Sequence, residues 1–266
     1  LYIKMFYDNK EKKLSNKYLS NGFVIHNIEE QKSLSWIRGV FCKIVKKHLP
    51  EIKEKKPENI LNNVHKYIEV SKLNKFRLNI INEVNSIKSF RENYYKISKN
   101  LIDIVVGNEI AMQLRVSLSI QLPKDDSSLL PVHADTWTGV SPFETVIWLP
   151  LVDCYKTKSM YILPPKKTEV LKKLFLNKKI KKGDDIFKKI KKDLIWLNVK
   201  YGQVVIFDQS LPHGNVVNDE KETRWSMNCR FKSIFTPYAD KKIGEYYEPI
   251  TLKAASKRGI SYKLPE

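Results

Sequence analysis

The chain has 266 residues, 42% of them hydrophobic, and its 48 Lys and Arg against 29 Asp and Glu give a formal net charge of +19 at pH 7. This length favours one elaborated domain, and no apolar run approaches the roughly 18 residues that a membrane helix needs. The positive charge is compatible with an anionic partner, but in a chain where lysine exceeds arginine a solvated lysine surface is the simpler interpretation.

The cysteines and the N-terminal stretch favour a cytoplasmic location. Cys42, Cys154 and Cys229 are far apart and form no CxxC pair, which argues against a disulfide framework or a zinc ribbon. The opening "LYIKMFYDNKEKK" lacks the apolar core of a signal peptide. We therefore expect a protein of the reducing cytoplasm.

Residues 1–110 are expected to form a mainly helical N-terminal layer. The stretch 27–49 predicts a helix with Asn27 as its N-cap, acids in its first turn and lysines in its last. Apolar residues at helical spacing continue through 58–68, 72–87 and 90–107, where Gly107 is a natural stop.

After Gly107 the pattern changes to that of strands. Residues 111–123 alternate apolar and polar side chains, with Leu118 and Ile120 opposed to Ser117 and Ser119. Further short strands are expected at 144–153, 159–164, 195–199, 202–207 and 223–235. These strands predict a β-sandwich or an open barrel with helices packed on one sheet.

A lysine-rich segment interrupts the strands. Residues 156–200 hold 15 lysines against 4 acids, with helical apolar spacing at 169–176 and 184–194. The segment is a candidate contact for an anionic substrate or a mobile lid, but it lacks aromatic interleaving and any helix-turn-helix or zinc-finger spacing, so nucleic acid is a minor interpretation. We divide the single domain 1–266 into the helical layer 1–110, a β core at 111–235 containing the insertion 156–200, and a tail at 236–266.

The stretch "LPVHADTWTG" contains a candidate pair of metal ligands. Side chains at i and i+2 of an extended segment project on the same side, so His133 and Asp135 can reach one ion. His213 follows an apolar strand and is the candidate third ligand, whereas the other histidines lie in the helical part without a second ligand nearby. Two histidines and one carboxylate form the facial triad of non-haem Fe(II) oxygenases. A His-x-Asp pair arises by chance in about one chain in four of this composition, so its context decides.

Arg224 supplies part of that context. It lies eleven residues after His213, across a polar loop, so both side chains would face one cavity at different depths. A planar guanidinium binds a carboxylate through two hydrogen bonds, which suits the distal carboxylate of 2-oxoglutarate. Arg230 lies on the same strand face but about 20 Å further at ~3.3 Å per residue, so we expect one of the two arginines to serve.

Together "VHADTWTG", "TVIWLPLVDCYKTKSMYILP", "VKYGQVVIFDQSLPHGNVVN" and "TRWSMNCRF" resemble the phytanoyl-CoA dioxygenase-like branch of the Fe(II)/2-oxoglutarate oxygenases over residues 112–232. The resemblance implies a double-stranded β-helix (jelly-roll, cupin-like) core. It implies Fe(II) on a set of three ligands: His133, Asp135 and His213. It implies that dioxygen is a co-substrate and that 2-oxoglutarate is held by four residues: Arg224, Asn215, Trp148 and Gln121. Related halogenases leave the carboxylate position open for chloride, so Asp135 favours hydroxylation or another oxidation over chlorination.

The residues after Asp135 are candidates to line the substrate side of the site: Thr136, Trp137 and Thr138. A core position is an equally good interpretation of Trp137. The opening "YLSNGFVIHNIEE" resembles bacterial members from surface-carbohydrate gene clusters. It implies that the substrate is a sugar, or an anionic nucleotide-linked or carrier-linked sugar, hydroxylated during polysaccharide biosynthesis.

Two other classes of function remain compatible with the sequence. One is a cupin-like protein that does not oxygenate, such as an isomerase, an epimerase or a binding module. The other is a basic protein that binds nucleic acid or a membrane surface through the lysine-rich segment.

Overall fold

Two antiparallel sheets organise the computed structural model, which describes residues 6–178, 180 and 185–264. Within these residues, one sheet has seven strands in the order β1-β7-β4-β9-β2-β10 with β3 also paired to β9, and the other has the order β6-β5-β8. The strands are β1 (Phe23–Asn27), β2 (Ile110–Gln113), β3 (Ser117–Gln121), β4 (Thr145–Pro150), β5 (Tyr161–Ile162), β6 (Ile195–Trp196), β7 (Gln203–Asp208), β8 (His213–Gly214), β9 (Arg224–Ser233) and β10 (Tyr247–Pro249).

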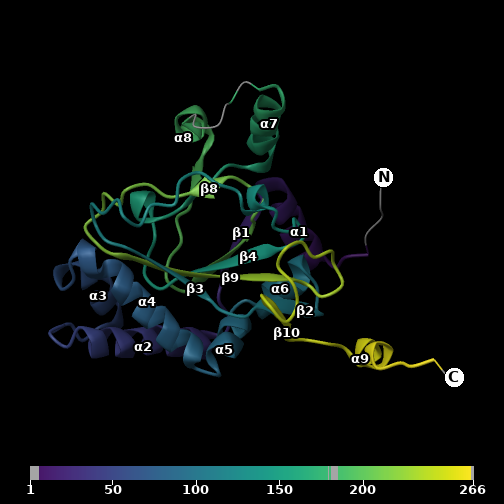
Figure 1. The fold of residues 1–266 in the computed structure, drawn as a ribbon, viewed down its shortest axis with the longest axis horizontal. Helices are drawn as coiled ribbons and strands as arrows, with labels where there is room; N and C mark the ends of the chain where they lie inside the picture. Colours follow the sequence, from purple (N-terminus) through teal and green to yellow (C-terminus); the bar gives the residue numbers. More distant parts are fainter. Residues whose placement is uncertain (1–5, 179, 181–184, 265–266) are drawn as a thin grey trace.

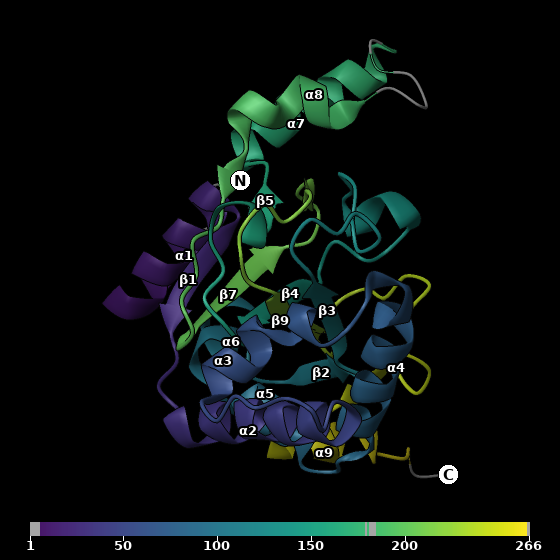
Figure 2. The ribbon, with the colours of Figure 1, turned by 90° about the vertical axis from the view of Figure 1, so that its left-hand side faces the viewer.

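Helices cover the large sheet on the side away from the small one. The helices are α1 (Asn9–Asn21), α2 (Gln31–His48), α3 (Pro57–Asn62), α4 (Val70–Ser86), α5 (Phe90–Lys96), α6 (Lys99–Val105), α7 (Pro165–Leu176), α8 (Ile186–Ile190) and α9 (Ala254–Ile260). Figure 1 and Figure 2 show α2 to α5 packed under the large sheet, whereas α7 and α8 project at the opposite end of the molecule. In the described part of the chain no helix is long and apolar enough to cross a bilayer.

The central strand β9 shows why the chain folds in this way. Its side chains alternate between two faces. On the helical face Trp225 is fully buried, packs edge-on against Phe41 and Phe76 at ring-centroid distances of 6.1 and 6.3 Å, and donates a 2.9 Å hydrogen bond from Nε1 to the carbonyl of Leu61. One aromatic ring thus joins α2, α3 and α4 to the sheet.

The opposite face of the same strands is polar and hollow. Residues at alternate positions of β3, β4 and β9 line one cavity between the sheets, and they are Ser117, Ser119, Val146, Trp148, Arg224, Ser226, Asn228 and Arg230. Because the strand period is two, every second residue of these strands enters the main core instead. The period-two pattern of the sequence therefore decides which side chains can form a site.

Two expectations for the N-terminal half were wrong in detail. The helix expected at 27–49 begins at Gln31 with Glu30 as its N-cap, and Asn27 instead ends strand β1. The apolar β-formers Phe23, Val24 and Ile25 pair with β7, and Asn27 continues this pairing opposite Gln203, so the helix begins later than its pattern indicated. Gly107 follows α6 with a positive φ of 123°, as a stop requires.

The strand expected at 111–123 is also interrupted. It forms β2 and β3, both paired with β9, and Val116 lies in the break between them. The side-chain amide of Asn85 satisfies the backbone hydrogen bonds of Val116 at this break. Its Oδ1 accepts from Val116 N at 2.9 Å, and its Nδ2 donates to Val116 O at 3.1 Å. The backbone can leave the ladder there without losing its hydrogen bonds.

The strands expected at 144–153, 159–164, 195–199, 202–207 and 223–235 are confirmed as β4, β5, β6, β7 and β9. Helical spacing in the lysine-rich segment is confirmed by α7 and α8, although residues 179 and 181–184 lie outside the described residues. In the C-terminal part, β10 pairs with β2 before the exposed helix α9.

Candidate metal centre

Two histidines and an aspartate from separate segments converge at the open end of the cavity between the sheets. His213 forms β8, and His133 pairs with it through two backbone hydrogen bonds of 3.0 and 2.8 Å. Asp135 begins a short 3-10 turn two residues later. One ligand atom from each of these residues lies within 4.8 Å of the others, which is close enough to hold one metal ion.

The histidines are held in the tautomer that metal binding needs. His133 Nδ1 lies 2.8 Å from the carbonyl of Pro131, and His213 Nδ1 lies 2.8 Å from the carbonyl of Leu211. A carbonyl can only accept, so each Nδ1 carries the proton and donates. Each ring then presents its Nε2 as the ligand atom, which is the arrangement that carbonyl-supported metal histidines use.

Asp135 is fixed by its second oxygen. Arg230 donates from one guanidinium nitrogen to Asp135 Oδ2 at 2.6 Å, while Asp135 Oδ1 lies 3.8 Å from His133 Nε2. Arg230 also donates to Gln209 Oε1 at 3.1 Å and to the Tyr246 hydroxyl at 3.2 Å. The carboxylate therefore has one oxygen engaged by Arg230 and one facing the histidines.

The electrostatics agree with a site for a cation. Burial and the neighbouring His133 lower the pKa of His213 to about 4, so its ring is neutral at pH 7. Burial alone would raise the pKa of Asp135, but the positive charge of Arg230 lowers it below its usual value. His213 and Asp135 are thus in their metal-binding protonation states without a metal.

Arg224 lines the same cavity, of about 260 Å³, as the three ligands. It is 3% exposed, and its guanidinium donates to Ser119 Oγ at 2.8 Å and to the carbonyl of Ser159 at 3.2 Å. Its Nε is buried without an acceptor, and within the described chain no carboxylate pairs with it. Burial lowers the pKa of Arg224 to about 10, which still leaves the group charged at pH 7.

Other residues expected around a co-substrate differ in their placement. Trp148 and Asn215 line the cavity, and Asn215 Oδ1 accepts from Leu130 N at 2.6 Å. Gln121 does not line it: its Nε2 donates to the carbonyl of Val216 at 2.6 Å, and its Oε1 meets Asn215 at 3.5 Å. Gln121 therefore supports the loop behind Asn215.

The residues after Asp135 turn away from the cavity. None of Thr136, Trp137 and Thr138 lines it. Thr138 Oγ1 donates back to the carbonyl of Asp135 at 2.8 Å, which closes the short turn. Trp137 is 45% exposed and meets the Phe175 ring of α7 edge-on at 5.7 Å, so it joins the metal loop to the lysine-rich segment.

Sequence reasoning missed the part played by Arg230. Both Arg224 and Arg230 line the cavity, one hydrogen-bonded to Ser119 and the other beside Asp135, so the expectation that one of them holds a carboxylate of the co-substrate stays a prediction. Their shared strand face was visible in the sequence. The contact with Asp135 was not, since 95 positions separate the two residues.

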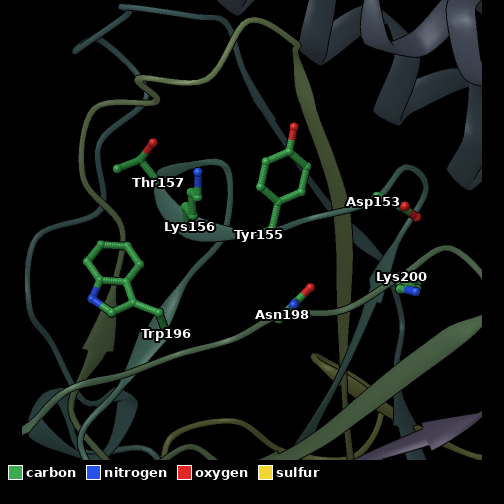
Figure 3. Close-up of a pocket in the computed structure, with 7 residues that line it drawn as sticks. All are labelled: Asp153, Tyr155, Lys156, Thr157, Trp196, Asn198 and Lys200. Carbon is green, nitrogen blue, oxygen red and sulfur yellow. The ribbon is translucent and has the colours of Figure 1, made fainter.

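A larger hollow of about 670 Å³ lies at the two ends of the lysine-rich segment (Figure 3). Seven residues line it, namely Asp153, Tyr155, Lys156, Thr157, Trp196, Asn198 and Lys200, and none of them lines the metal cavity. Among the described residues of 156–200, Met160 lines the metal cavity. The described lysines of residues 156–200 therefore do not line the metal cavity.

No protein-family model matches the chain, and no curated protein is similar to it in sequence. Solved structures do share its fold. A non-heme monooxygenase, ThoJ, in complex with Ni is 11% identical with a TM-score of 0.56, over 91% of this chain and 85% of that one.

EctD from S. alaskensis with 2-oxoglutarate and 5-hydroxyectoine is 11% identical with a TM-score of 0.57, over 88% of this chain and 81% of that one. SnoN, a non-heme alpha ketoglutarate dependent epimerase from nogalamycin biosynthesis, is 12% identical with a TM-score of 0.50, over 88% and 85%. At these identities the likeness establishes the arrangement of sheets and helices.

Proposed function

We propose that this protein is an Fe(II)- and 2-oxoglutarate-dependent dioxygenase that hydroxylates a small molecule, and that its two sheets form a double-stranded β-helix. The observation that carries the proposal is the unpaired Arg224 guanidinium in the same cavity as a His-Asp-His cluster. Its fold is shared with a structure described as a non-heme monooxygenase and with a structure that contains 2-oxoglutarate.

The donor set fits Fe(II). His133, Asp135 and His213 offer two imidazole nitrogens and one carboxylate oxygen, which is the facial triad of non-haem iron oxygenases. Such a triad leaves coordination positions for a co-substrate and dioxygen. When bound, iron would allow dioxygen to oxidise 2-oxoglutarate to succinate and CO2 with one of its oxygen atoms and a substrate C–H bond to an alcohol with the other.

The opposite end of the cavity fits the distal carboxylate of 2-oxoglutarate. Burying a cation without an anionic partner costs roughly several kcal/mol of desolvation free energy, and a bound anion offsets this cost. Arg224 Nε has no acceptor, so a carboxylate there satisfies it and forms a charge-assisted bond. Ser119 and the carbonyl of Ser159 hold the guanidinium in place beforehand.

The remaining wall of the cavity orients the co-substrate and excludes water. Val146, Trp148, Met160 and Phe207 supply apolar surface between the metal cluster and Arg224. The low polarity of this surface strengthens the ion pair at Arg224. His133 and His213 keep their Nδ1 atoms on carbonyls, so each ring is oriented with Nε2 available for iron.

The substrate that we propose is a sugar or a nucleotide-linked or carrier-linked sugar of polysaccharide biosynthesis. Support comes from the resemblance of residues 18–30 to carbohydrate-cluster members and from the net charge of +19, which favours anionic substrates. A screen of nucleotide sugars and glycans for succinate release, with Fe(II), ascorbate and 2-oxoglutarate, tests this choice.

An anaerobic titration tests the oxygenase proposal. Fe(II) and 2-oxoglutarate added together should give a weak visible charge-transfer band that neither gives alone. Absence of the band together with absence of a thermal shift would rule out this co-substrate and leave the cupin-like binding protein.

Changing Arg224 to Ala separates the two halves of the site. Because Arg224 meets the distal carboxylate and not the metal ligands, affinity for 2-oxoglutarate should fall by roughly 100-fold or more, as loss of a buried charged hydrogen bond costs about 3 kcal/mol. The affinity of Arg224→Ala for Mn(II) should stay within about twofold of the wild-type affinity. Exposed Arg115, which donates to Asn82, is the matched control as Arg115→Ala. Equal losses of metal and co-substrate would show that Arg224 is not the anchor.

A further inference from the structure

A second cavity adjoins the metal cavity along one wall. It measures about 440 Å³ and lies between α4, strand β3 and residues 127–130. Four residues line both cavities, namely Ser117, Ser119, Leu130 and Asn228. The views of Figure 1 and Figure 2 agree that α4 lies beside β3, at the side of the large sheet.

The lining of this second cavity is rich in hydrogen-bonding groups. Serines at positions 117, 119, 127 and 128 face it together with Asn74 and Asn228. Strand β3 pairs with β9 alone among the described strands, so its other edge presents free backbone groups. The side chains of Leu118 and Ile120 are buried, so these two residues line the cavity through the backbone groups of this strand edge.

Asn228 leaves an acceptor unused at the shared wall. Its Oδ1 is buried and has no hydrogen-bond partner within the described part of the protein. A buried carbonyl oxygen without a donor costs about 1–3 kcal/mol. A ligand hydroxyl that reaches the wall from either cavity would remove this cost.

Arg77 gives the cavity its charge. It is the charged side chain among the lining residues, and one of its guanidinium nitrogens donates to Asn74 Oδ1 at 2.7 Å. No described carboxylate pairs with it. A half-buried guanidinium with free donors is suited to phosphate or carboxylate.

We propose that this second cavity binds the non-reacting part of the substrate, and that the substrate is a polyhydroxylated compound whose anionic group pairs with Arg77. This inference rests on the proposed function. The serines, Asn74 and Asn228 meet its hydroxyl groups, Arg77 meets its phosphate or carboxylate, and the shared wall leads the rest of the molecule towards His133 and Asp135.

Calorimetric binding of three sugars to protein loaded anaerobically with Mn(II) and 2-oxoglutarate tests the inference. Glucose 6-phosphate, glucuronate and glucose compare a phosphate, a carboxylate and a neutral compound. One or both anionic sugars should bind about tenfold more tightly than glucose, as expected for a partly exposed ion pair. Arg77→Ala should abolish this preference, and Arg77→Glu should reverse it.

Arg115→Ala is the matched control, because Arg115 also donates to an α4 asparagine at 2.7 Å but lines neither cavity. It should keep the wild-type preference. A preference that survives in Arg77→Ala, or an absence of preference in the wild type, would overturn the inference. The charge-transfer band with Fe(II) and 2-oxoglutarate is measured on the same variants. A wild-type protein with the band but without the preference refutes the second cavity alone, whereas loss of the band refutes the oxygenase.

Discussion

Asp135 shows how a single side chain can be restricted to one role. Arg230 takes its Oδ2, and the main chain of Gln209 accepts from its backbone nitrogen at 3.0 Å. Gln209 is itself buried and donates from Nε2 to Glu144 Oε2 at 3.0 Å and to the carbonyl of Ser141 at 3.0 Å. This chain of contacts leaves Oδ1 as the oxygen that faces the histidines, so a metal held at this cluster would meet Asp135 through one oxygen.

Replacing Arg230 with Met should therefore weaken the metal centre. Loss of a partner that orients a ligand typically costs roughly 10- to 100-fold in metal affinity. Mn(II) affinity of the variant, measured by calorimetry, should fall by that amount, and Arg230→Lys should restore only part because one ammonium cannot reach all three partners. Tyr246→Phe removes only the hydroxyl contact and serves as control. Unchanged affinity in Arg230→Met would show that the pair is incidental.

His213 should make the metal-free protein sensitive to mild acid. Its pKa is 6.5 as a free group and is lowered to about 4 in the fold, chiefly by burial. Between these pH values the unfolded chain binds a proton at this residue that the folded protein does not bind. The contribution of His213 to the free energy of unfolding is therefore present above about pH 6.5 and is lost as the pH falls towards 4, by up to about 1.4 kcal/mol per pH unit. Urea unfolding across this range should show a shallower pH slope for His213→Gln than for the wild type. Identical slopes would contradict the assignment to His213.

At the scale of elements, β9 connects the site to the helical layer. Its even-numbered residues from Arg224 to Arg230 line the metal cavity, and its odd-numbered residues pack in the core. A change in register by one residue would exchange these two sets. The packing of Trp225 against α2 and α4 therefore holds Arg224 and Ser226 in the cavity.

Trp225→Ala should cost about 3–5 kcal/mol of unfolding free energy, because it leaves a cavity among α2, α3 and α4 and leaves the carbonyl of Leu61 without its donor. Urea denaturation measures this value. Phe235, which is 61% exposed, is the control as Phe235→Ala and should change stability by less than about 0.5 kcal/mol. A loss of less than about 1 kcal/mol in Trp225→Ala would show that this contact does not hold the layers together.

For the whole molecule, the net charge of +19 and the site belong to different surfaces. The described lysines of the segment 156–200 do not line the metal cavity, although Lys156 and Lys200 line the hollow of Figure 3. The charge therefore acts on encounter and solubility, while the cavity between the sheets decides chemistry.

Duplex DNA should accordingly bind in a non-specific way. Retention on immobilised DNA should fall steeply between about 50 and 200 mM salt, as counterion release requires. Saturating DNA should leave the affinity for 2-oxoglutarate unchanged. Salt-resistant binding that alters this affinity would instead favour a nucleic-acid function.

Local patterns in the sequence determined much of this protein. Strand periodicity predicts β4, β7 and β9 and places Arg224 and Arg230 on one face. Short spacing brings His133 and Asp135 to one side of the chain. These features depend on neighbours along the chain, so they need no knowledge of the fold.

Tertiary structure alone decided the rest. The two-residue strand β8 is too short to have a pattern of its own, yet its pairing with His133 and β5 places His213 in the site. The contact of Arg230 with Asp135 spans 95 positions, and the cavity beside Arg77 needs α4, β3 and a loop at once. Such contacts arise from sheet pairing and helix packing between distant segments, which residue type and spacing do not encode.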